Sequence, residues 1–538
     1  MAYGNADKYF SGTFDGGGFT ITYSASVTYD YISLFRKCDG ATIKNLHVTG
    51  TLTASNRHAA GFVAHAKGNV TLINCRSSIT INSSHNGDAT HGGLVGLVDY
   101  SSSITLRGCV FDGKFTTTNG TTNCGGLVGW SESPLTVEDC LFAPASGNTT
   151  SMGLGTLVRV RGEIARTYTN SYYTETFGTA QGKQARTISA GTDVTALAIS
   201  GTATEYGAAR ITTYGTNKGF KYNGTYYAGN GDEVTLTLTH ADKPGYTFSQ
   251  YTATPGTLSA QTETSATLNM TDANQTVSAE YTKNEVTLTD GVNLSASGLT
   301  GFVGKQCDVS YTREFTVGKT STVCLPFAYT KQGTEGSFYE FTSITEEGGE
   351  YVATMTEPVS TTLAANTPYL FTPAVSSVTF TGTIASVPAT FTAGETVKTD
   401  WTFKGTFSTI NWDGTQTGTY GFSAQNVGEN ISQGEFVKVG EYVRIKPMRC
   451  YLEYTGSDAS WAAARGMTRA AAADEPLPET IKVRLIGANG EVTAIGTLHT
   501  QTGEVVLDGW YTLDGTRLSG QPTRKGIYVN NGKKVIIK

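Results

Sequence analysis

Short apolar runs separated by Gly, Asn, Ser and Asp follow one another along the first third of the chain, with no helical period. The phrase Gly-Gly-Leu-Val-Gly occurs at residues 92–96 and 125–129, and Ala-Gly-Phe-Val-Ala stands at residues 60–64. Counted from the second residue of each phrase, the steps are 93 − 61 = 32 and 126 − 93 = 33 residues. Strand-sized runs repeated at such a period predict stacked, nearly identical coils. The pattern therefore predicts a parallel β-helix over the amino-terminal region.

A cysteine marker keeps the same step along the chain. Cys75, Cys109 and Cys140 each close a segment that begins with Leu or Val. Equivalent residues of stacked coils lie about 4.8 Å apart, so we expect the three thiols to form a buried ladder of small apolar side chains. The sequence has no Cys-x-x-Cys and no Cys/His pairing at zinc spacing, so we expect no metal site and no cofactor. The glycines that start the Gly-Leu-Val-Gly phrases, Gly93 and Gly126, are expected to permit the tight corner where a coil turns.

The repeat ends after residue 183, and the pattern of apolar and polar residues changes. Clean alternation around a Gly-Asn-Gly turn predicts a β-hairpin over residues 221–238. An Ala-rich stretch that closes with two prolines predicts a linker. The expected fold class is all-β, an N-terminal right-handed parallel β-helix followed by β-sandwich-like modules. We expect the β-helix over 1–183, a small β-repeat module over 184–283, a β-sandwich or jelly roll over 284–456, the linker over 457–479 and a C-terminal β-domain over 480–538.

Three segments resemble known families of bacterial surface proteins. Residues 12–21 (Gly-Thr-Phe-Asp-Gly-Gly-Gly-Phe-Thr-Ile), with the Gly-Gly-Leu-Val-Gly phrases, resemble GLUG-repeat β-helices. Residues 205–283 look like the internalin B-repeat modules that act as stalks or spacers. Residues 511–517, 525–528 and 533–538 resemble the C-terminal sorting domain of Bacteroidetes type IX secretion substrates. The resemblances imply a protein outside the cell or on its surface, with the secretion machinery as one partner.

The composition narrows the class of protein further. The chain has 538 residues, 64 of them Gly, and only 16% of its residues are charged, an all-β mix typical of extracellular proteins. The formal net charge is −6 and no basic stripe occurs, so we expect no nucleic-acid partner. No run approaches the roughly 18 apolar residues of a membrane-spanning helix, so we expect no membrane span.

The first ten residues lack the features of a leader. Residues 1–10 have no basic start, apolar core or cleavage site of a signal peptide, and they run directly into a β-helix coil. Solenoids need capped ends. We therefore expect a fragment whose natural start lies upstream.

Two tryptophans are the candidate ligand-binding residues of the 284–456 segment, which resembles an uncharacterised module of surface proteins from gut Bacteroidetes. Trp401 and Trp412 fall in a Gly-rich stretch. An exposed indole ring matches the apolar face of a sugar, so the pair is a candidate glycan-binding site. The alternative is that both rings are buried core anchors.

A catalytic site is not expected, although many β-helices cleave polysaccharides. The polar candidates in the coils neither recur at one ladder position nor pair at a spacing typical of acid/base catalysis. These candidates are Asp15, His65, His85, Asp88, His91 and Asp99. Asp15 stands before three glycines, a segment interpreted as a turn rather than a calcium loop. We name no catalytic residue.

The function expected from the sequence is binding or adhesion at the bacterial surface. Solenoids present long surfaces that suit extended partners, so the β-helix face or the sandwich loops are expected to contact a polysaccharide or a host glycoprotein. Two alternatives stay open. The first is a β-helix polysaccharide lyase or glycoside hydrolase, and the second is a structural stalk or spacer of a larger surface protein.

Overall fold

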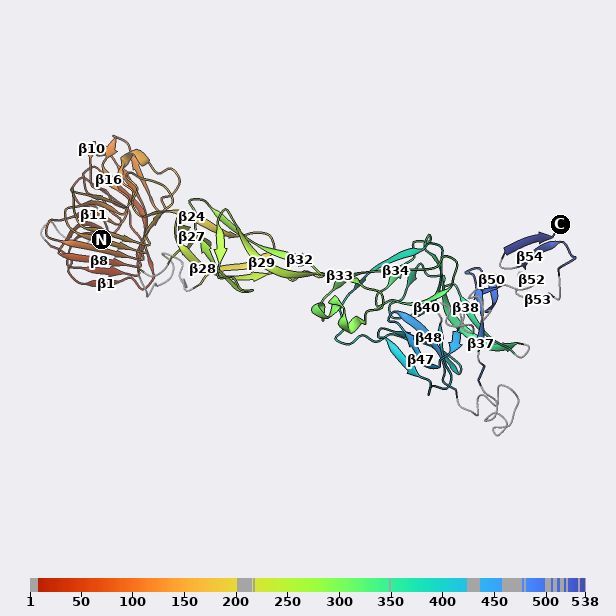
Figure 1. Cartoon of the computed structure of the whole chain (residues 1–538). Coiled ribbons are helices and arrows are strands. Elements are labelled where there is room, and N and C mark those ends of the chain that lie inside the picture. Colours follow the sequence, from red (N-terminus) through yellow and green to blue (C-terminus); the bar gives the residue numbers. More distant parts are fainter. Residues whose placement is uncertain are drawn as a thin grey trace. The chain divides into compact units, whose positions relative to one another are not determined.

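Each amino-terminal repeat forms one coil of a parallel β-helix of about five turns (Figure 1). The chain folds into two compact units, residues 1–242 with 248–281, and residues 243–247 with 282–538. The computed structural model describes residues 8–200, 215, 218–347, 350–422, 436–456, 477–478, 480–498, 505–506, 510–512, 517–518, 521–530 and 533–537.

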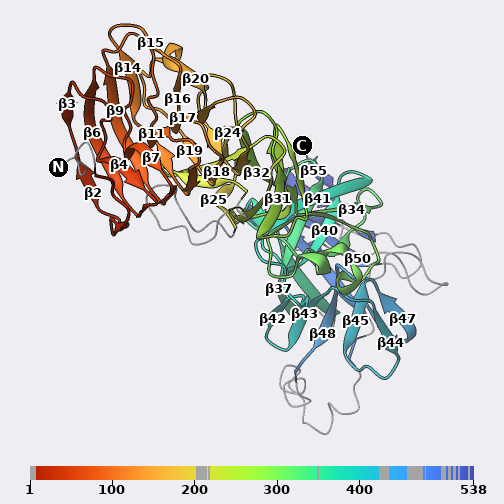
Figure 2. The ribbon, with the colours of Figure 1, turned by 90° about the vertical axis from the view of Figure 1, so that its left-hand side faces the viewer.

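Three parallel sheets make up the walls of the β-helix, and each coil adds a strand to every sheet (Figure 2). The first sheet contains β1 (Thr13–Asp15), β5 (Thr42–Lys44), β8 (Asn69–Ile73), β12 (Ser103–Arg107), β18 (Leu135–Glu138) and β22 (Arg166–Thr169). The second contains β4 (Phe35–Asp39), β7 (Val63–Lys67), β11 (Val95–Val98), β17 (Val128–Ser131) and β21 (Val158–Val160). The third contains β2 (Thr20–Thr22), β3 (Ala25–Val27), β6 (His47–Ala54), β9 (Arg76–Ser83), β13 (Val110–Phe111), β14 (Lys114–Thr117), β19 (Leu141–Phe142) and β23 (Tyr172–Tyr173). Short pairs join β10 (Gly87–Asp88) to β15 (Thr121–Thr122) and β16 (Cys124–Gly125) to β20 (Gly153–Gly155), and a 3₁₀ turn covers Thr150–Met152.

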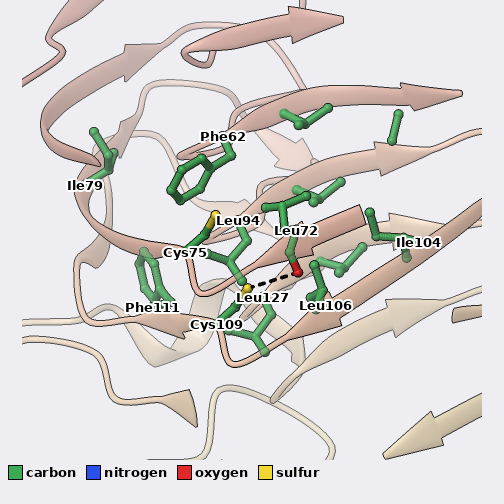
Figure 3. Packing of buried hydrophobic residues seen from close by; sticks show 14 of the residues in the cluster. Phe62, Leu72, Cys75, Ile79, Leu94, Ile104, Leu106, Cys109, Phe111 and Leu127 are labelled. Atoms are coloured by element: carbon green, nitrogen blue, oxygen red, sulfur yellow. Dashed lines mark hydrogen bonds between the residues drawn. The ribbon is translucent and has the colours of Figure 1, made fainter. Parts of the chain in front are cut away.

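Identical positions of successive coils stack into apolar ladders inside the β-helix. In the second sheet the Val of each phrase pairs in register with the next, a ladder formed by Val63, Val95, Val128 and Val158. Cys75, Cys109 and Cys140 are buried free thiols beside it, as the sequence predicts. The Cys109 thiol donates to the Leu72 carbonyl oxygen at 3.4 Å, and Phe62 and Phe111 lie among Leu and Ile side chains in the same core (Figure 3).

The coils turn at the residue before the cysteine marker, or before Leu46 and Ser171, which take the place of the cysteine in the outer coils. This residue has a left-handed backbone at five successive positions and is Asn, Gly or Asp, the types that adopt positive φ most readily. The five positions are Asn45 (φ 54°), Asn74 (φ 51°), Gly108 (φ 62°), Asp139 (φ 51°) and Asn170 (φ 44°). The left-handed corner therefore lies between the first and third sheets.

The glycines of the Gly-Leu-Val-Gly phrases serve a different purpose from the one expected. Gly93 and Gly126 do not have positive φ. A Cβ at Gly93 would lie 2.5 Å from the Gly126 carbonyl oxygen, and a Cβ at Gly126 would lie 2.0 Å from the Thr156 carbonyl oxygen. Adjacent coils thus approach too closely for any side chain. Gly is required at these positions because there is no room for a Cβ atom, and not because the backbone needs a positive φ.

The carboxyl-terminal end of the β-helix is closed by its own chain. The Gln181 amide oxygen accepts from the Leu157 and Val158 backbone N–H groups at 2.9 and 3.0 Å, and its NH₂ donates to the Val158 carbonyl at 2.7 Å. One side chain therefore occupies the bonding positions of a further strand at the edge of the second sheet. At the third sheet, β24 (Lys183–Ala190) pairs in parallel with β23 and antiparallel with β27.

The module that begins at residue 184 belongs to the same compact unit as the β-helix. Its strands are β25 (Val194–Ile199), β26 (Phe220–Tyr222), β27 (Thr225–Gly229), β28 (Glu233–His240), β29 (Tyr246–Thr254), β30 (Thr257–Ser259), β31 (Ser265–Asn269) and β32 (Gln275–Lys283). The hairpin expected over 221–238 around the Gly-Asn-Gly turn is not formed; the observed hairpin joins β26 to β27 and turns at Asn223-Gly224. The strand β28 pairs with β25 and β31 in a separate sheet.

The second unit encloses an aromatic core between two main sheets. The smaller contains β33 (Glu285–Leu288), β34 (Cys307–Glu314) and β41 (Ser377–Ile384). The larger contains β35 (Ser321–Cys324), β37 (Gly336–Glu347), β38 (Glu350–Thr356), β40 (Pro368–Pro373), β42 (Glu395–Lys398), β43 (Trp401–Thr406), β45 (Thr419–Phe422), β46 (Phe436–Lys438), β48 (Arg449–Tyr454), β49 (Thr480–Ile486), β50 (Val492–Leu498) and β51 (Val505–Val506). Two-stranded pairs join β36 (Tyr329–Thr330) to β39 (Thr362–Leu363) and β44 (Ile410–Asp413) to β47 (Glu441–Ile445), and 3₁₀ turns cover Leu294–Ala296 and Gly298–Phe302.

The expected boundary at residue 480 does not separate two sheets. The strand β49 pairs in parallel with β38 and antiparallel with β46, so it is an inner strand of the larger sheet. A separate sheet closes the chain and contains β52 (Trp510–Thr512), β53 (Arg517–Leu518), β54 (Gly526–Asn530) and β55 (Lys533–Ile537). Most of the expected linker over 457–479 lies outside the described residues.

Candidate functional site

One outer face of the β-helix gathers aromatic and cationic side chains, and we call it the second-sheet face. Register pairs Lys37 with His65, His65 with Leu97, and Leu97 with Trp130, so these four residues form a ladder along the axis. The guanidinium of Arg159 lies 4.3 Å from the centroid of the Trp130 ring. The face is therefore a continuous strip across the five strands of the sheet.

A sandwich of three rings lies at the amino-terminal end of this face. The Tyr31 ring stacks on His58 at 4.6 Å and on His65 at 4.8 Å between centroids, with interplanar angles of 10° and 14°. Lys37 Nζ lies 5.3 Å from the Tyr31 ring centroid, and His65 Nε2 lies 3.4 Å from Asp99 Oδ2. Burial lowers the pKa of His58 to about 4, and burial also lowers the pKa of His65. Both imidazoles are therefore neutral at pH 7.

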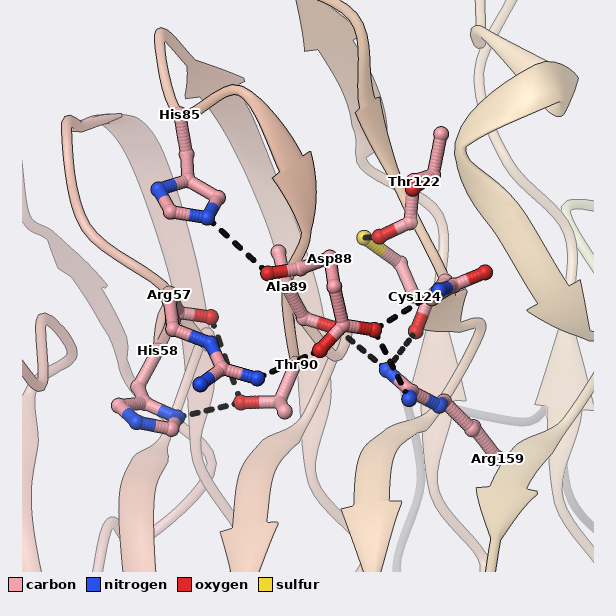
Figure 4. Close-up of polar contacts among 10 residues, drawn as sticks. Arg57, His58, His85, Asp88, Ala89, Thr90, Thr122, Cys124 and Arg159 are labelled. Atoms are coloured by element: carbon pink, nitrogen blue, oxygen red, sulfur yellow. Dashed lines mark hydrogen bonds and ion pairs between the residues drawn. The ribbon is translucent and has the colours of Figure 1, made fainter.

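A network of charges borders the face at the coil edge (Figure 4). The Asp88 carboxylate accepts from Arg57 Nη2 at 2.5 Å, from Arg159 Nη2 at 2.9 Å and from Asn123 Nδ2 at 2.8 Å. Arg159 also donates to the carbonyl oxygens of Ala89 and Asn123 at 2.8 and 2.7 Å. Three coils are tied together by this one guanidinium, because these acceptors stand in two coils and Arg159 in a third.

The network holds Asp88 as a carboxylate. Burial opposes ionisation, but the hydrogen bond from Asn123 and the charges of Arg159 and Arg57 lower its pKa. Its oxygens are already occupied by three donors, and His85 Nε2 contacts the Asp88 backbone oxygen rather than the carboxylate. The cluster is therefore suited to binding and rigidity rather than to accepting a proton.

The other polar candidates lie apart from this network. The Asp15 carboxylate accepts from the Asn45 side chain and the Gly17 N–H, both at 3.0 Å, which forms the expected turn and lowers its pKa to about 2. His91 is fully buried, its Nε2 lies 2.8 Å from Ser83 Oγ, and burial lowers its pKa to about 3. Neither residue presents a free acid or base to solvent.

Trp401 and Trp412 both lie in the interior of the second unit. Their exposed fractions are 5% and 7%. Trp401 contacts the rings of Tyr420 and Tyr454 at 5.7 and 5.2 Å, and Trp412 meets Tyr451 edge-on at 5.6 Å. These positions correspond to the core-anchor alternative, and neither ring offers an open face to a sugar.

Sequence reasoning missed the second-sheet face, although a signal for it was present. The residue that directly follows each repeated phrase is His65, Leu97 or Trp130. Since the preceding Val points inward and the glycine or alanine between them lies against the neighbouring coil, this position faces outward. Arg159 could not be found this way, because the last coil has no complete phrase.

The described part of the chain contains neither a cluster of metal ligands nor a membrane-spanning helix. No group of three or more His, Cys, Asp or Glu side chains there is close enough to hold a metal ion. Within the same residues, no helix is long and apolar enough to cross a membrane.

Comparison with known proteins identifies one segment. Residues 208–285 match the divergent InlB B-repeat domain, a family of bacterial surface proteins. No curated protein and no solved structure matches the chain. The resemblance of this segment to internalin B-repeats is thereby confirmed.

Proposed function

We propose that this chain is a bacterial surface protein that binds an extended glycan along the second-sheet face of its β-helix. The observation that carries the proposal is the ladder of Lys37, His65, Leu97 and Trp130, bordered by the Arg57–Asp88–Arg159 network. A B-repeat segment next to a β-helix supports a place on the bacterial surface.

The chemistry of the face supports a polymer of sugars as the ligand. Leu97 and Trp130 are partly exposed and offer apolar contact, and Lys37 and Arg57 offer hydrogen-bond donors to a hydroxyl-rich chain. His65 is buried, with 8% of its surface exposed, and stacks against the Tyr31 ring. Rungs repeat at about 4.8 Å, so the contacts are spread along the axis rather than gathered in a single pocket. We propose a host glycoprotein or dietary polysaccharide as the source of the glycan.

Binding without cleavage is part of the proposal. Glycosidases need one protonated and one free carboxyl group across the scissile bond. Asp88, the carboxyl group of the network that borders the face, is ionised and bonded to three donors. A lyase or hydrolase would therefore need carboxyl groups other than that of Asp88.

Export through a type IX-like sorting tail and GLUG-type repeats belong to the same proposal. The supporting features are the final sheet of β52–β55 and the coil phrases. Deletion of residues 509–538 should abolish surface display in a host with this secretion system, measured by antibody labelling of intact cells. Unchanged display would contradict the sorting role.

The binding proposal is tested with purified chain on immobilised mucins and plant polysaccharides, with retention and new sugar ends measured together. We expect retention without new ends, and at least tenfold weaker retention for Trp130→Ala and Lys37→Gln. Lys44→Gln is the matched control, because Lys44 lies on the outer side of the first sheet and pairs with Asp15. Equal loss in the control would contradict the assignment of the face.

The assay also separates the two alternatives. New sugar ends would establish an enzyme and overturn the binding proposal. Neither retention nor cleavage would favour a structural spacer, the role that the B-repeat segment supports.

A further inference from the structure

Two tyrosine–aspartate contacts join the β-helix to the B-repeat module, and they run in opposite directions. Tyr222 of the module donates from its hydroxyl to Asp112 Oδ2 of the β-helix at 2.6 Å. Tyr172 of the β-helix donates to Asp232 Oδ2 of the module at 2.9 Å. Burial raises the pKa of both tyrosine hydroxyls, so both remain protonated donors.

Each aspartate has further partners at this interface between the β-helix and the module, which we call the seam. Arg76 Nε donates to Asp112 Oδ2 at 2.8 Å, and the Ser78 hydroxyl donates to Asp112 Oδ1 at 2.5 Å. Asp232 accepts from its own Gly229 N–H at 2.8 Å and pairs with Lys183, the first residue of β24. Removal of either tyrosine hydroxyl therefore leaves a buried carboxylate short of one donor.

An apolar cluster lies between the two contacts. Phe220 of the module is fully buried and packs on the Tyr172 ring at 4.9 Å and on Tyr227 at 5.4 Å. Val110 and Leu141, on the outer side of the third sheet, are buried in the same cluster. Outward positions of a solenoid sheet normally face water, so the hairpin of β26 and β27 covers a face that would otherwise be exposed.

From this geometry we propose that the B-repeat module is the clamp and cap of the β-helix, so that the two fold and unfold as one cooperative unit. The module is thus not an independent stalk segment. The hairpin of β26 and β27 packs against the outer side of the third sheet, while β24 pairs with β23, the last β-helix strand of that sheet. The unit that presents the second-sheet face then extends to residue 281 rather than ending at 183.

The test is hydrogen exchange of the full chain in increasing urea, read by mass spectrometry on peptides from β7–β12 and from β28–β32. We expect both sets of peptides to report the same global opening equilibrium in the unmodified protein. Two different opening equilibria, with the module opening first, would overturn the proposal without the need for any variant.

Variants add a second, independent readout. Tyr222→Phe and Tyr172→Phe should each raise the opening equilibrium of both peptide sets by about tenfold, since each removes a hydrogen bond to a buried carboxylate. Tyr227→Phe is the control, because its ring packs at the seam but its hydroxyl has no hydrogen-bond partner among the described residues, and it should change neither set. Faster exchange confined to the module, or no change, would refute the clamp.

Discussion

The close approach of adjacent coils at Gly126 makes a single methyl group a severe perturbation. In Gly126→Ala the new Cβ would lie 2.0 Å from the Thr156 carbonyl oxygen and 2.8 Å from two atoms of the Phe142 ring. The oxygen belongs to the backbone of the next coil and cannot rotate away, so the coils must separate locally. Overpacking of this kind costs about 3 kcal/mol when backbone has to move.

The number of residues in the compact unit relates this loss of unfolding free energy to a change in melting temperature. The compact unit contains 242 + 34 = 276 residues, from Met1–Asp242 and Phe248–Tyr281. For domains near this size, each kcal/mol shifts the melting temperature by roughly 2 °C, so Gly126→Ala should lower it by roughly 6 °C. Scanning calorimetry on the full chain measures the shift, with hydrogen exchange of solenoid peptides to assign the transition.

The matched control is a glycine in the first coil. In Gly12→Ala the added Cβ would lie 3.5 Å from two atoms of the Phe10 ring, an ordinary contact, and Gly12 does not have positive φ. Its melting temperature should stay the same or rise slightly, because Ala restricts the unfolded chain. If the Gly126→Ala and Gly12→Ala variants have the same melting temperature, the steric explanation of the repeated glycine is wrong.

Three further predictions concern buried polar groups and thiols. Asp290→Asn should destabilise the second unit by about 2 kcal/mol in urea denaturation, because it weakens a 2.7 Å ion pair to the buried Arg449; an unchanged midpoint would contradict this. The solenoid should lose stability as pH falls from 6.5 through about 4, because the unfolded chain binds protons at His58 and His91 before the folded chain does. Burial lowers the pKa of His58 to about 4 and that of His91 to about 3. Melting curves at pH 7 and pH 4.5 test this, and equal stability would refute it. All eight cysteines are buried and free, so they should react with a thiol reagent only after unfolding, and rapid labelling of the native chain would disprove their burial.

The sequence was sufficient to predict the coil and its ladders. A fixed period places equivalent residues on top of one another, so Val95, Val128 and the marker cysteines could be assigned to the core without coordinates. The corner residues were also visible in the sequence, because Asn74 and Asp139 recur before the cysteine. The repeated glycines compete with them as candidate corners, because Gly is the more frequent turn residue.

The seam between β-helix and module could not be predicted. Tyr222 and Asp112 are 110 residues apart, and Tyr172 and Asp232 are 60 residues apart. Neither pair belongs to a repeat, so no period marks it. Burial of Trp401 and Trp412 was equally open, since the same ring suits a core and a sugar, and only the neighbouring strands decide between them.

The amide of Gln181 has a consequence for how copies of this protein behave at high density. Parallel coils are self-complementary, so an open end is a template on which another chain can continue the stack. At the carboxyl-terminal edge of the second sheet that template is already used by an internal side chain. A strand of a second molecule therefore finds the backbone groups of residues 157 and 158 already bonded, which disfavours end-to-end stacking through this edge.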